Sequence, residues 1–155
     1  MESVSFSADD NAPRGASEVR SQARVSQFVA FSVGENAYGV DIMSVREIRS
    51  WSETTTLPDQ SYGARGVLDI RGRIVEVFDL ASILGAQSRQ SESTRVVLVV
   101  AREGRDIGMV VDAVSDIVDA SPEDFRDPPK SGKVLAIVKQ DDKLISILDL
   151  NALFS

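Results

Sequence analysis

From residue 27 onward, short apolar runs rich in Val and Ile alternate with polar turns that contain Gly, Asp, Asn or Lys. Runs of about 4–8 such residues are typical of β-strands, and two runs joined by a short turn are typical of a hairpin. One predicted hairpin has its turn at residues 34–36, and the other has its turn at residues 102–105. The strands predicted for them are 28–33 with 37–40, and 95–100 with 107–111.

Two short helices are predicted beside the strands. Residues 74–78 predict a strand, and Asp79 follows where its carboxylate can accept hydrogen bonds from the free N–H groups of a helix that begins at the next residue. Gly85 stands where this helix would end. Ser121 is followed by Pro and two acidic residues, a pattern that predicts the start of the second helix.

The second half of the chain repeats the pattern of the first. A shift of 69 positions places Gly39 on Gly108, and a shift of 70 places residues 74–80 on residues 144–150. Val-rich strands align to some extent in any β protein, so chance similarity is the alternative explanation. The length of the two matches favours two similar β modules of about 60 residues each.

Composition divides the chain into a tail and two modules. Residues 1–24 combine Ser, Ala, Arg, Asp and Pro without a period, so we expect a disordered tail. We assign residues 25–88 to a first β-barrel module and 89–155 to a second, because the polar stretch 86–93 marks a boundary. Barrels are favoured because many short strands without a long helix would otherwise leave exposed sheet edges. The modules together form one all-β domain, and exchange of strands between them stays open.

Composition also removes several classes of function. The 155 residues include no His and no Cys, which excludes Ser-His-Asp triads, Cys or His zinc sites and disulfides. The net charge is -7 and the basic residues are scattered, which disfavours nucleic acid as a partner. The longest apolar run, residues 96–101, is far shorter than the ~20 residues that span a bilayer. We therefore expect a soluble protein that does not insert into a membrane. The lack of Cys fits a reducing compartment, so we expect the protein in the cytoplasm.

Acidic pairs are the remaining candidates for metal binding or acid–base catalysis. They are Asp141 with Asp142, at a predicted turn, and Glu123 with Asp124. Neither pair has the spacing of an EF-hand, and the chain contains no phosphate-binding loop. We expect no enzyme activity, no cofactor and no metal.

Other residues leave a structural and a functional interpretation open. Arg71, at a turn, is either solvated or offers its guanidinium to an acidic partner. Trp51 either plugs the end of a barrel or belongs to an interface. Glu47 is either a solvated strand charge or a contact at the rim of an interface. Core packing is the favoured interpretation for Val45 and Val114.

Several motifs together resemble the CheW family of chemotaxis coupling proteins. The resemblance covers residues 27–154, and the motifs occur in the order and at the spacing of that family. The motifs are residues 27–31 with 38–42, 45–48, 66–72, 74–80, 108–116 and 144–150. The resemblance implies two intertwined, five-stranded SH3-like barrels.

The same resemblance implies a function. It implies a non-catalytic adaptor that couples the cytoplasmic tips of methyl-accepting chemoreceptors to the histidine kinase CheA, whose regulatory domain shares this fold, at membrane-bound receptor arrays. Arg71 matches a receptor-facing position. The other positions implied to bind receptor or kinase are Glu47, Val45, Gly66, Val96, Gly108, Val114 and Ile117.

We expect an apolar groove between the modules, edged by Arg71 and Glu47, to receive the receptor tip, and the kinase to bind the equivalent end of the other barrel. The alternatives are a small β-barrel module that binds nucleic acid or another protein, and coupling in a pilus, gliding or development pathway. A carboxylate-based enzyme is the third hypothesis.

Three stretches depart from the family pattern. Asp69 stands beside Arg71, and we expect it to mute or redirect the attraction of that Arg for an acidic partner. Glu76 occupies a position that Pro often holds in the family. The segment 128–133 is shorter than in the family pattern. We expect the strand that follows it to be trimmed to residues 134–137, and we expect weaker partner binding there.

Overall fold

The computed structural model describes residues 26–60, 62–130 and 132–154. The chain forms two compact units that are discontinuous in sequence. Among the described residues, unit 1 comprises 26–30, 37–42, 116–130 and 132–154, and unit 2 comprises 31–36, 43–60 and 62–115. The tail expected at residues 1–24 lies outside the described part of the chain. No helix in that part is long and apolar enough to cross a membrane.

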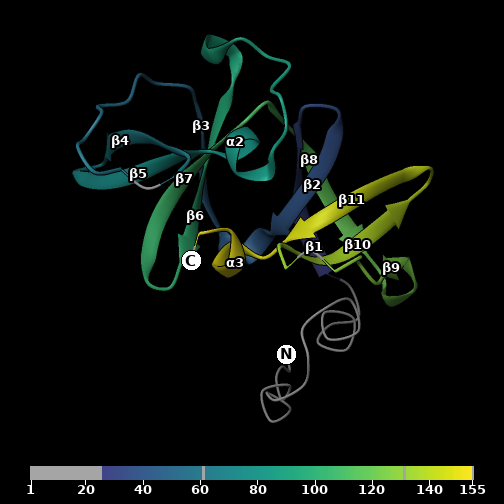
Figure 1. The fold of residues 1–155 in the computed structure, drawn as a ribbon. Coiled ribbons are helices and arrows are strands. Elements are labelled where there is room, and N and C mark those ends of the chain that lie inside the picture. Colours follow the sequence, from purple (N-terminus) through teal and green to yellow (C-terminus); the bar gives the residue numbers. More distant parts are fainter. Residues whose placement is uncertain (1–25, 61, 131, 155) are drawn as a thin grey trace. The chain divides into compact units, whose positions relative to one another are not determined.

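Unit 2 is built on a five-stranded sheet with the order β3-β6-β7-β5-β4 (Figure 1). Neighbouring strands are antiparallel, except that β5 and β7 are parallel. Beyond the end of β3, Thr55 exchanges backbone hydrogen bonds of 3.0 and 2.8 Å with Val67 of β4, so the sheet closes into a barrel. The strands are β3 (Val45–Ser50), β4 (Ala64–Ile70), β5 (Arg73–Asp79), β6 (Val96–Arg102) and β7 (Arg105–Val111).

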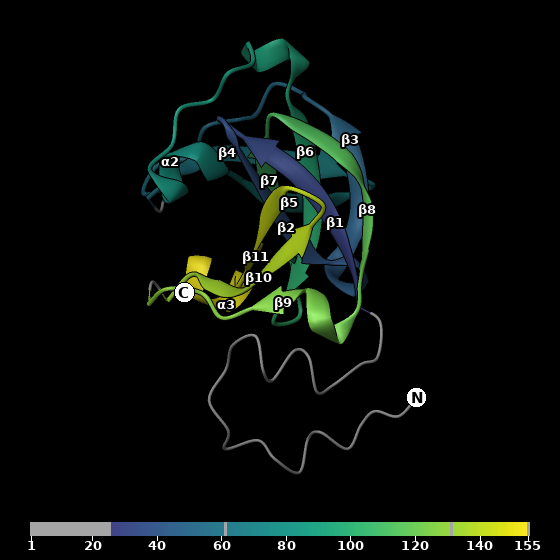
Figure 2. The same ribbon diagram turned by 90° about the vertical axis from the view of Figure 1, so that its right-hand side faces the viewer.

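Unit 1 is built on the sheet β8-β1-β2-β11-β10-β9, in which β2 and β11 are parallel. β1 and β8 run side by side in Figure 2. The 3₁₀ turn η4 leads from β8, at one edge of this order, directly to β9 at the other edge, so this sheet also closes on itself. The elements of this sheet are β1 (Ser26–Val33), β2 (Asn36–Asp41), β8 (Ala113–Ala120), η4 (Pro122–Asp124), β9 (Phe125–Arg126), β10 (Val134–Gln140) and β11 (Lys143–Leu148). The end of β1 from residue 31, residue 36 of β2 and residues 113–115 of β8 belong to unit 2.

Each barrel has its own core, formed by the inward-facing residues of its alternating strands. In unit 1, Phe28 and Phe125 pack edge to face with ring centroids 6.1 Å apart. In unit 2, Trp51 packs against a buried cluster of aliphatic side chains. That cluster consists of Leu68, Ile70, Val75, Val77, Val97, Val99 and Val110.

The two halves of the sequence exchange strands. In the parallel pairs, Gly108 lies opposite Val77, and Gly39 lies opposite Ile147. These pairs are equivalent under the shifts of 69 and 70 positions, so each barrel combines the first hairpin of one repeat with the remaining strands of the other. The boundary expected between residues 88 and 89 therefore lies inside unit 2 rather than between the units.

Short helices follow the last strand of each repeat. Asp79 caps α2 (Leu80–Leu84) by accepting a hydrogen bond of 3.1 Å from the N–H of Ala81, and Gly85 ends it with φ 73°. Asp149 caps α3 (Leu150–Leu153) in the same way. The helix predicted after Ser121 is the single turn η4, and the other 3₁₀ turns in the described residues are η2 (Ile42–Ser44) and η3 (Glu92–Thr94).

One sequence expectation about the strands is wrong. The strand at 134–137 was expected to be trimmed, but β10 has seven residues, as many as β4. It pairs with β11 along its length, and a β-bulge between Val134 and Ala136 lets the ladder continue.

Candidate protein-binding surface

Arg71 is held on a rigid two-residue turn between β4 and β5. Arg71 and Gly72 have φ of 56° and 82°, as a type I′ hairpin turn requires. The Asp69 carboxylate accepts a hydrogen bond of 2.9 Å from the N–H of Gly72, which fixes the turn. The Arg71 side chain is 78% exposed. A planar set of five donors is thus presented to solvent from a fixed backbone position.

Glu47 links this turn to β3. Its carboxylate lies 3.1 Å from a guanidinium nitrogen of Arg49 and 3.5 Å from one of Arg71. The Glu47 side chain is only 20% exposed, whereas that of Arg71 is well solvated, so the pair orients Arg71 more than it stabilises the fold. The ionic partner of Arg71 is therefore Glu47, while Asp69 is occupied by the turn.

The side chains of strand β3 alternate between a half-buried face and an exposed face. Val45, Glu47 and Arg49 are half-buried, whereas Ile48 is 50% exposed. The Nε of Arg49 is buried and has no hydrogen-bond partner within the described residues. Exposed apolar residues and oriented charged groups are both features of protein interfaces, so Ile48 and the Arg71–Glu47 pair are each candidate contacts.

The remaining predicted residues divide between the two units. Val96 is half-buried in unit 2, and Ile117 on β8 of unit 1 is 56% exposed. Val45 and Val114 were expected to pack in the core, but both are half-buried and lie at its margin. Ile117 is the repeat equivalent of Ile48, so each barrel exposes an apolar residue at this place.

Two of the predicted residues are glycines that act through the backbone. Gly66 has φ +127°, and a Cβ added there would lie 2.4 Å from the carbonyl oxygen of Thr55, at the point where the barrel closes. Gly108 is buried in β7, and a Cβ there would lie 3.1 Å from a methyl group of Val97. Neither residue offers a side chain to a partner, so both support the surface indirectly.

Trp51 belongs to the end of the unit 2 barrel. It is half-buried against the aliphatic cluster, and the guanidinium carbon of Arg65 lies 5.5 Å from its ring centroid. This geometry is a cation–π contact. Of the two interpretations of Trp51, the structure supports the barrel plug.

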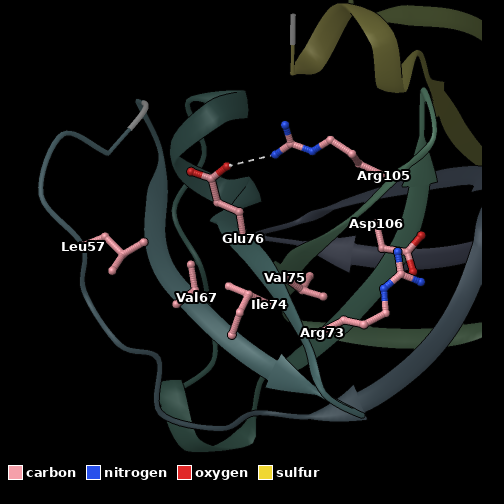
Figure 3. Close-up of a pocket in the computed structure, with 8 residues that line it drawn as sticks. All are labelled: Leu57, Val67, Arg73, Ile74, Val75, Glu76, Arg105 and Asp106. Carbon is pink, nitrogen blue, oxygen red and sulfur yellow. Dashed lines mark ion pairs between the residues drawn. The ribbon is translucent and has the colours of Figure 1, made fainter.

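A pocket of about 310 Å³ on unit 2 was not predicted from the sequence (Figure 3). Its apolar part includes Leu57 and Ile74, and Ile74 is 67% exposed. Residues distant in sequence meet there because β5 and β7 are parallel neighbours. The sequence feature that could have indicated this pocket is the apolar Ile74 near the start of β5, two residues after the turn. The lining residues are Leu57, Val67, Arg73, Ile74, Val75, Glu76, Arg105 and Asp106.

The role of Asp112, which holds three segments together through its carboxylate, was also not predicted from the sequence. It is 5% exposed, and its carboxylate accepts hydrogen bonds from the N–H of Gly34 at 2.8 Å, the N–H of Arg89 at 3.1 Å and the hydroxyl of Ser88. Burial alone would raise the pKa of Asp112, but these hydrogen bonds and the charge of Arg95 hold that pKa below its ordinary value of 3.8. The sequence feature that could have indicated this role is a single acidic residue directly after the apolar strand 107–111.

Comparison with known proteins identifies relatives. A family model described as a CheW-like domain matches residues 27–155. The chain is 33% identical over 135 residues to the probable chemotaxis protein CheW of Rhizobium etli, covering 83% of this chain and 87% of that protein. It is 31% identical over 137 residues to the chemotaxis protein CheW of Rhizobium meliloti, covering 83% and 86%. The solved structure of the scaffolding protein TtCheW from Thermoanaerobacter tengcongensis superposes with a TM-score of 0.78 at 30% identity, covering 84% of this chain and 88% of that one.

Proposed function

Because the chain belongs to the CheW-like family, we propose that it is an adaptor that couples chemoreceptors to a CheA-type histidine kinase. The observation that carries this proposal is the family match over residues 27–155, which spans both barrels. An adaptor needs surfaces rather than a reaction centre, and this role requires no catalytic residue. The protein would act at receptor arrays, where it holds receptor and kinase in register.

The receptor contact is assigned to the turn of unit 2. Arg71 supplies an exposed guanidinium whose direction is set by Glu47, and Ile48 supplies apolar surface on β3. A charged group at the rim of an interface mainly sets orientation and association rate, while apolar side chains supply affinity. An acidic helical segment with apolar residues on one face is the partner that this surface fits.

The other residues are assigned to the two partners together. Val96 and Val114 would contribute apolar contacts at the margin of unit 2, and Ile117 would do so on unit 1. Gly66 and Gly108 would contribute by maintaining the barrel that carries these contacts. The kinase is expected to contact the end of a barrel through its regulatory domain.

A binding experiment tests the receptor assignment. Arg71→Glu is expected to reduce the amount of receptor cytoplasmic fragment retained on the immobilised protein at least tenfold. Arg89→Glu is the matched control, because it makes the same charge change at a side chain that is 60% exposed and pairs with Glu35. Equal retention by the Arg71→Glu variant and the wild type, with both variants folded, would show that the assignment is wrong.

A further inference from the structure

In unit 2, the chain that follows helix α2 covers the end of a hairpin. The backbone oxygen of Gln87 lies 2.8 Å from the position of a Cβ added to Gly34, in the β1–β2 turn. The Ser88 hydroxyl and the Arg89 N–H both donate to the carboxylate of Asp112. Asp112 follows β7 directly and is 5% exposed. We call residues 85–94, which contain these contacts, the cover segment.

The internal repeat places Met43 where the other hairpin has Asp112, because the shift of 69 positions aligns the two residues. The side chain of Met43 is 82% exposed, although Met43 comes only two residues after β2. Val45 pairs with Val100, so the start of β3 lies beside the end of β6 and the β6–β7 turn. In that turn, no described atom lies within 4 Å of a Cβ added to Gly104. This place is open, whereas its repeat equivalent is covered.

The sequence before β1 corresponds in position to the cover segment. The cover segment precedes β6, and the same shift of 69 aligns it with residues 16–25, which directly precede β1. Val19 then falls on Ser88. Val19 and Met43 are separated in sequence by the same distance as Ser88 and Asp112, so residues 16–25 are long enough to make the equivalent contact.

The two residues of this contact change together between the repeats. In the covered place, the Ser88 hydroxyl donates to the carboxylate of Asp112, so both partners are polar. At the equivalent positions, Val19 and Met43 are both apolar. A Met side chain is flexible and adapts its shape to an apolar neighbour. The second pair is therefore as well matched as the first.

A charged pair at the turn is also kept. Arg89 of the cover segment pairs with Glu35 of the β1–β2 turn at 3.2 Å. Arg20 is the repeat equivalent of Arg89, and the β6–β7 turn supplies the carboxylate of Glu103, which is 62% exposed. Residues 16–25 thus have an Arg where the open turn offers an acid.

We propose that residues 16–25 dock beside the β6–β7 turn of unit 2 in the same chain, as the cover segment docks at the β1–β2 turn. Val19 packs on Met43, and Arg20 pairs with Glu103. Because Glu103 stands where the first turn has Gly34, the segment passes beside Gly104 and not over Glu103. For residues 16–24 this docking replaces the disorder expected from composition. It does not depend on the proposed coupling function.

Disulfide cross-linking tests the contact in the full chain, which has no Cys. Val19→Cys with Met43→Cys should form an intramolecular disulfide at least tenfold faster than Val4→Cys with Met43→Cys, the matched control outside the segment. A tail without a docking site would favour position 19 only about twofold, because its loop to position 43 is shorter. Non-reducing gels and mass spectrometry at low protein concentration distinguish cross-links within a molecule from those between molecules. Circular dichroism checks that the variants fold.

Oxidation of Met43 gives an independent measurement. A docked segment covers this side chain, so hydrogen peroxide should oxidise Met43 at least fivefold more slowly in the wild type than in Val19→Asp. Val4→Asp is the control and should leave the rate unchanged. Arg20→Glu should also speed the oxidation, because it places like charge beside Glu103, and adding Glu103→Arg to the same chain should restore the protection. Peptide mass spectrometry measures the sulfoxide.

Other outcomes overturn the proposal. Equal cross-linking rates for the Val19→Cys and Val4→Cys pairs, or oxidation of Met43 as fast in the wild type as in Val19→Asp, would show that residues 16–25 do not cover Met43. Cross-links mainly between molecules would overturn it by assigning the place to a second copy of this chain. Protection of Met43 only in the presence of a receptor fragment would overturn it by assigning the place to the receptor.

Discussion

Asp112 is predicted to be the most stability-sensitive polar residue of unit 2. Its buried carboxylate joins the β1–β2 turn, through Gly34, to the segment after α2, through Ser88 and Arg89. Asp112→Asn keeps the shape and one acceptor oxygen but places an N–H₂ group toward donors. A hydrogen bond to a charged group is worth about 1.5–3 kcal/mol, so the loss of one to two of them gives a destabilisation of about 3 kcal/mol. For a chain of this size, the midpoint of thermal unfolding should fall by roughly 6–12 °C.

The effect should depend on pH with a defined sign. The pKa of Asp112 is lowered in the folded protein. The ionised carboxylate therefore stabilises the fold fully above the pKa of the unfolded chain, near 3.8, and this contribution is lost as the pH falls through the folded-state pKa. The difference in unfolding free energy between the wild type and Asp112→Asn should be largest at neutral pH and should shrink on acidification below about pH 4.

The single Trp provides the assay. Trp51 packs in unit 2, so its fluorescence during thermal or urea unfolding reports on the unit that contains Asp112. Asp116→Asn is the control, because Asp116 is exposed and the same chemical change there should shift the midpoint by less than about 2 °C. The reasoning is refuted if Asp112→Asn unfolds together with the control at pH 7, or if its destabilisation does not change with pH.

Further predictions concern the turn and the glycines. Gly66→Ala should lower the midpoint of thermal unfolding by more than 10 °C, because the new Cβ would overlap the Thr55 carbonyl. Gly72→Ala has open space around the new Cβ and should lower the free energy of unfolding by only about 1 kcal/mol, because the backbone φ there is positive. Differential scanning calorimetry distinguishes the two variants. Arg71→Glu should leave the melting midpoint within about 2 °C of the wild type, because that side chain is 78% exposed, so any loss of partner binding would not be due to unfolding. Glu47→Ala should destabilise the protein by about 1–2 kcal/mol in urea unfolding, since half-buried Arg49 loses its carboxylate.

Local sequence signals predicted the strands and turns well. The hairpins, the Asp79 cap and the Gly85 helix end follow from alternation and capping chemistry, which depend on neighbouring residues. The internal repeat was also visible, because Gly39 and Gly108 occupy equivalent, tightly packed places beside a parallel strand. The strand exchange was left open, because pairing between β5 and β7 depends on which distant strand completes each barrel, and the periodicity of a strand does not identify its partner.

The candidate surface was only partly predictable for the same reason. Arg71 and Glu47 could be identified from motifs, but their contact depends on the closure of the barrel at Thr55. The pocket around Ile74 and the hydrogen bonds of Asp112 join segments that are far apart in sequence. The expected length of β10 was too short because it was inferred from comparison with a family pattern. The length of the strand is set by its pairing with β11.

The central claim is that this chain couples receptors to a kinase. The most direct measurement is the rate of kinase autophosphorylation in a mixture of the cognate receptor, kinase and this protein, compared with the same mixture without it. The account predicts that autophosphorylation rises at least tenfold on addition of the wild type, and rises much less with folded Arg71→Glu. No increase over the mixture of receptor and kinase alone would contradict the claim.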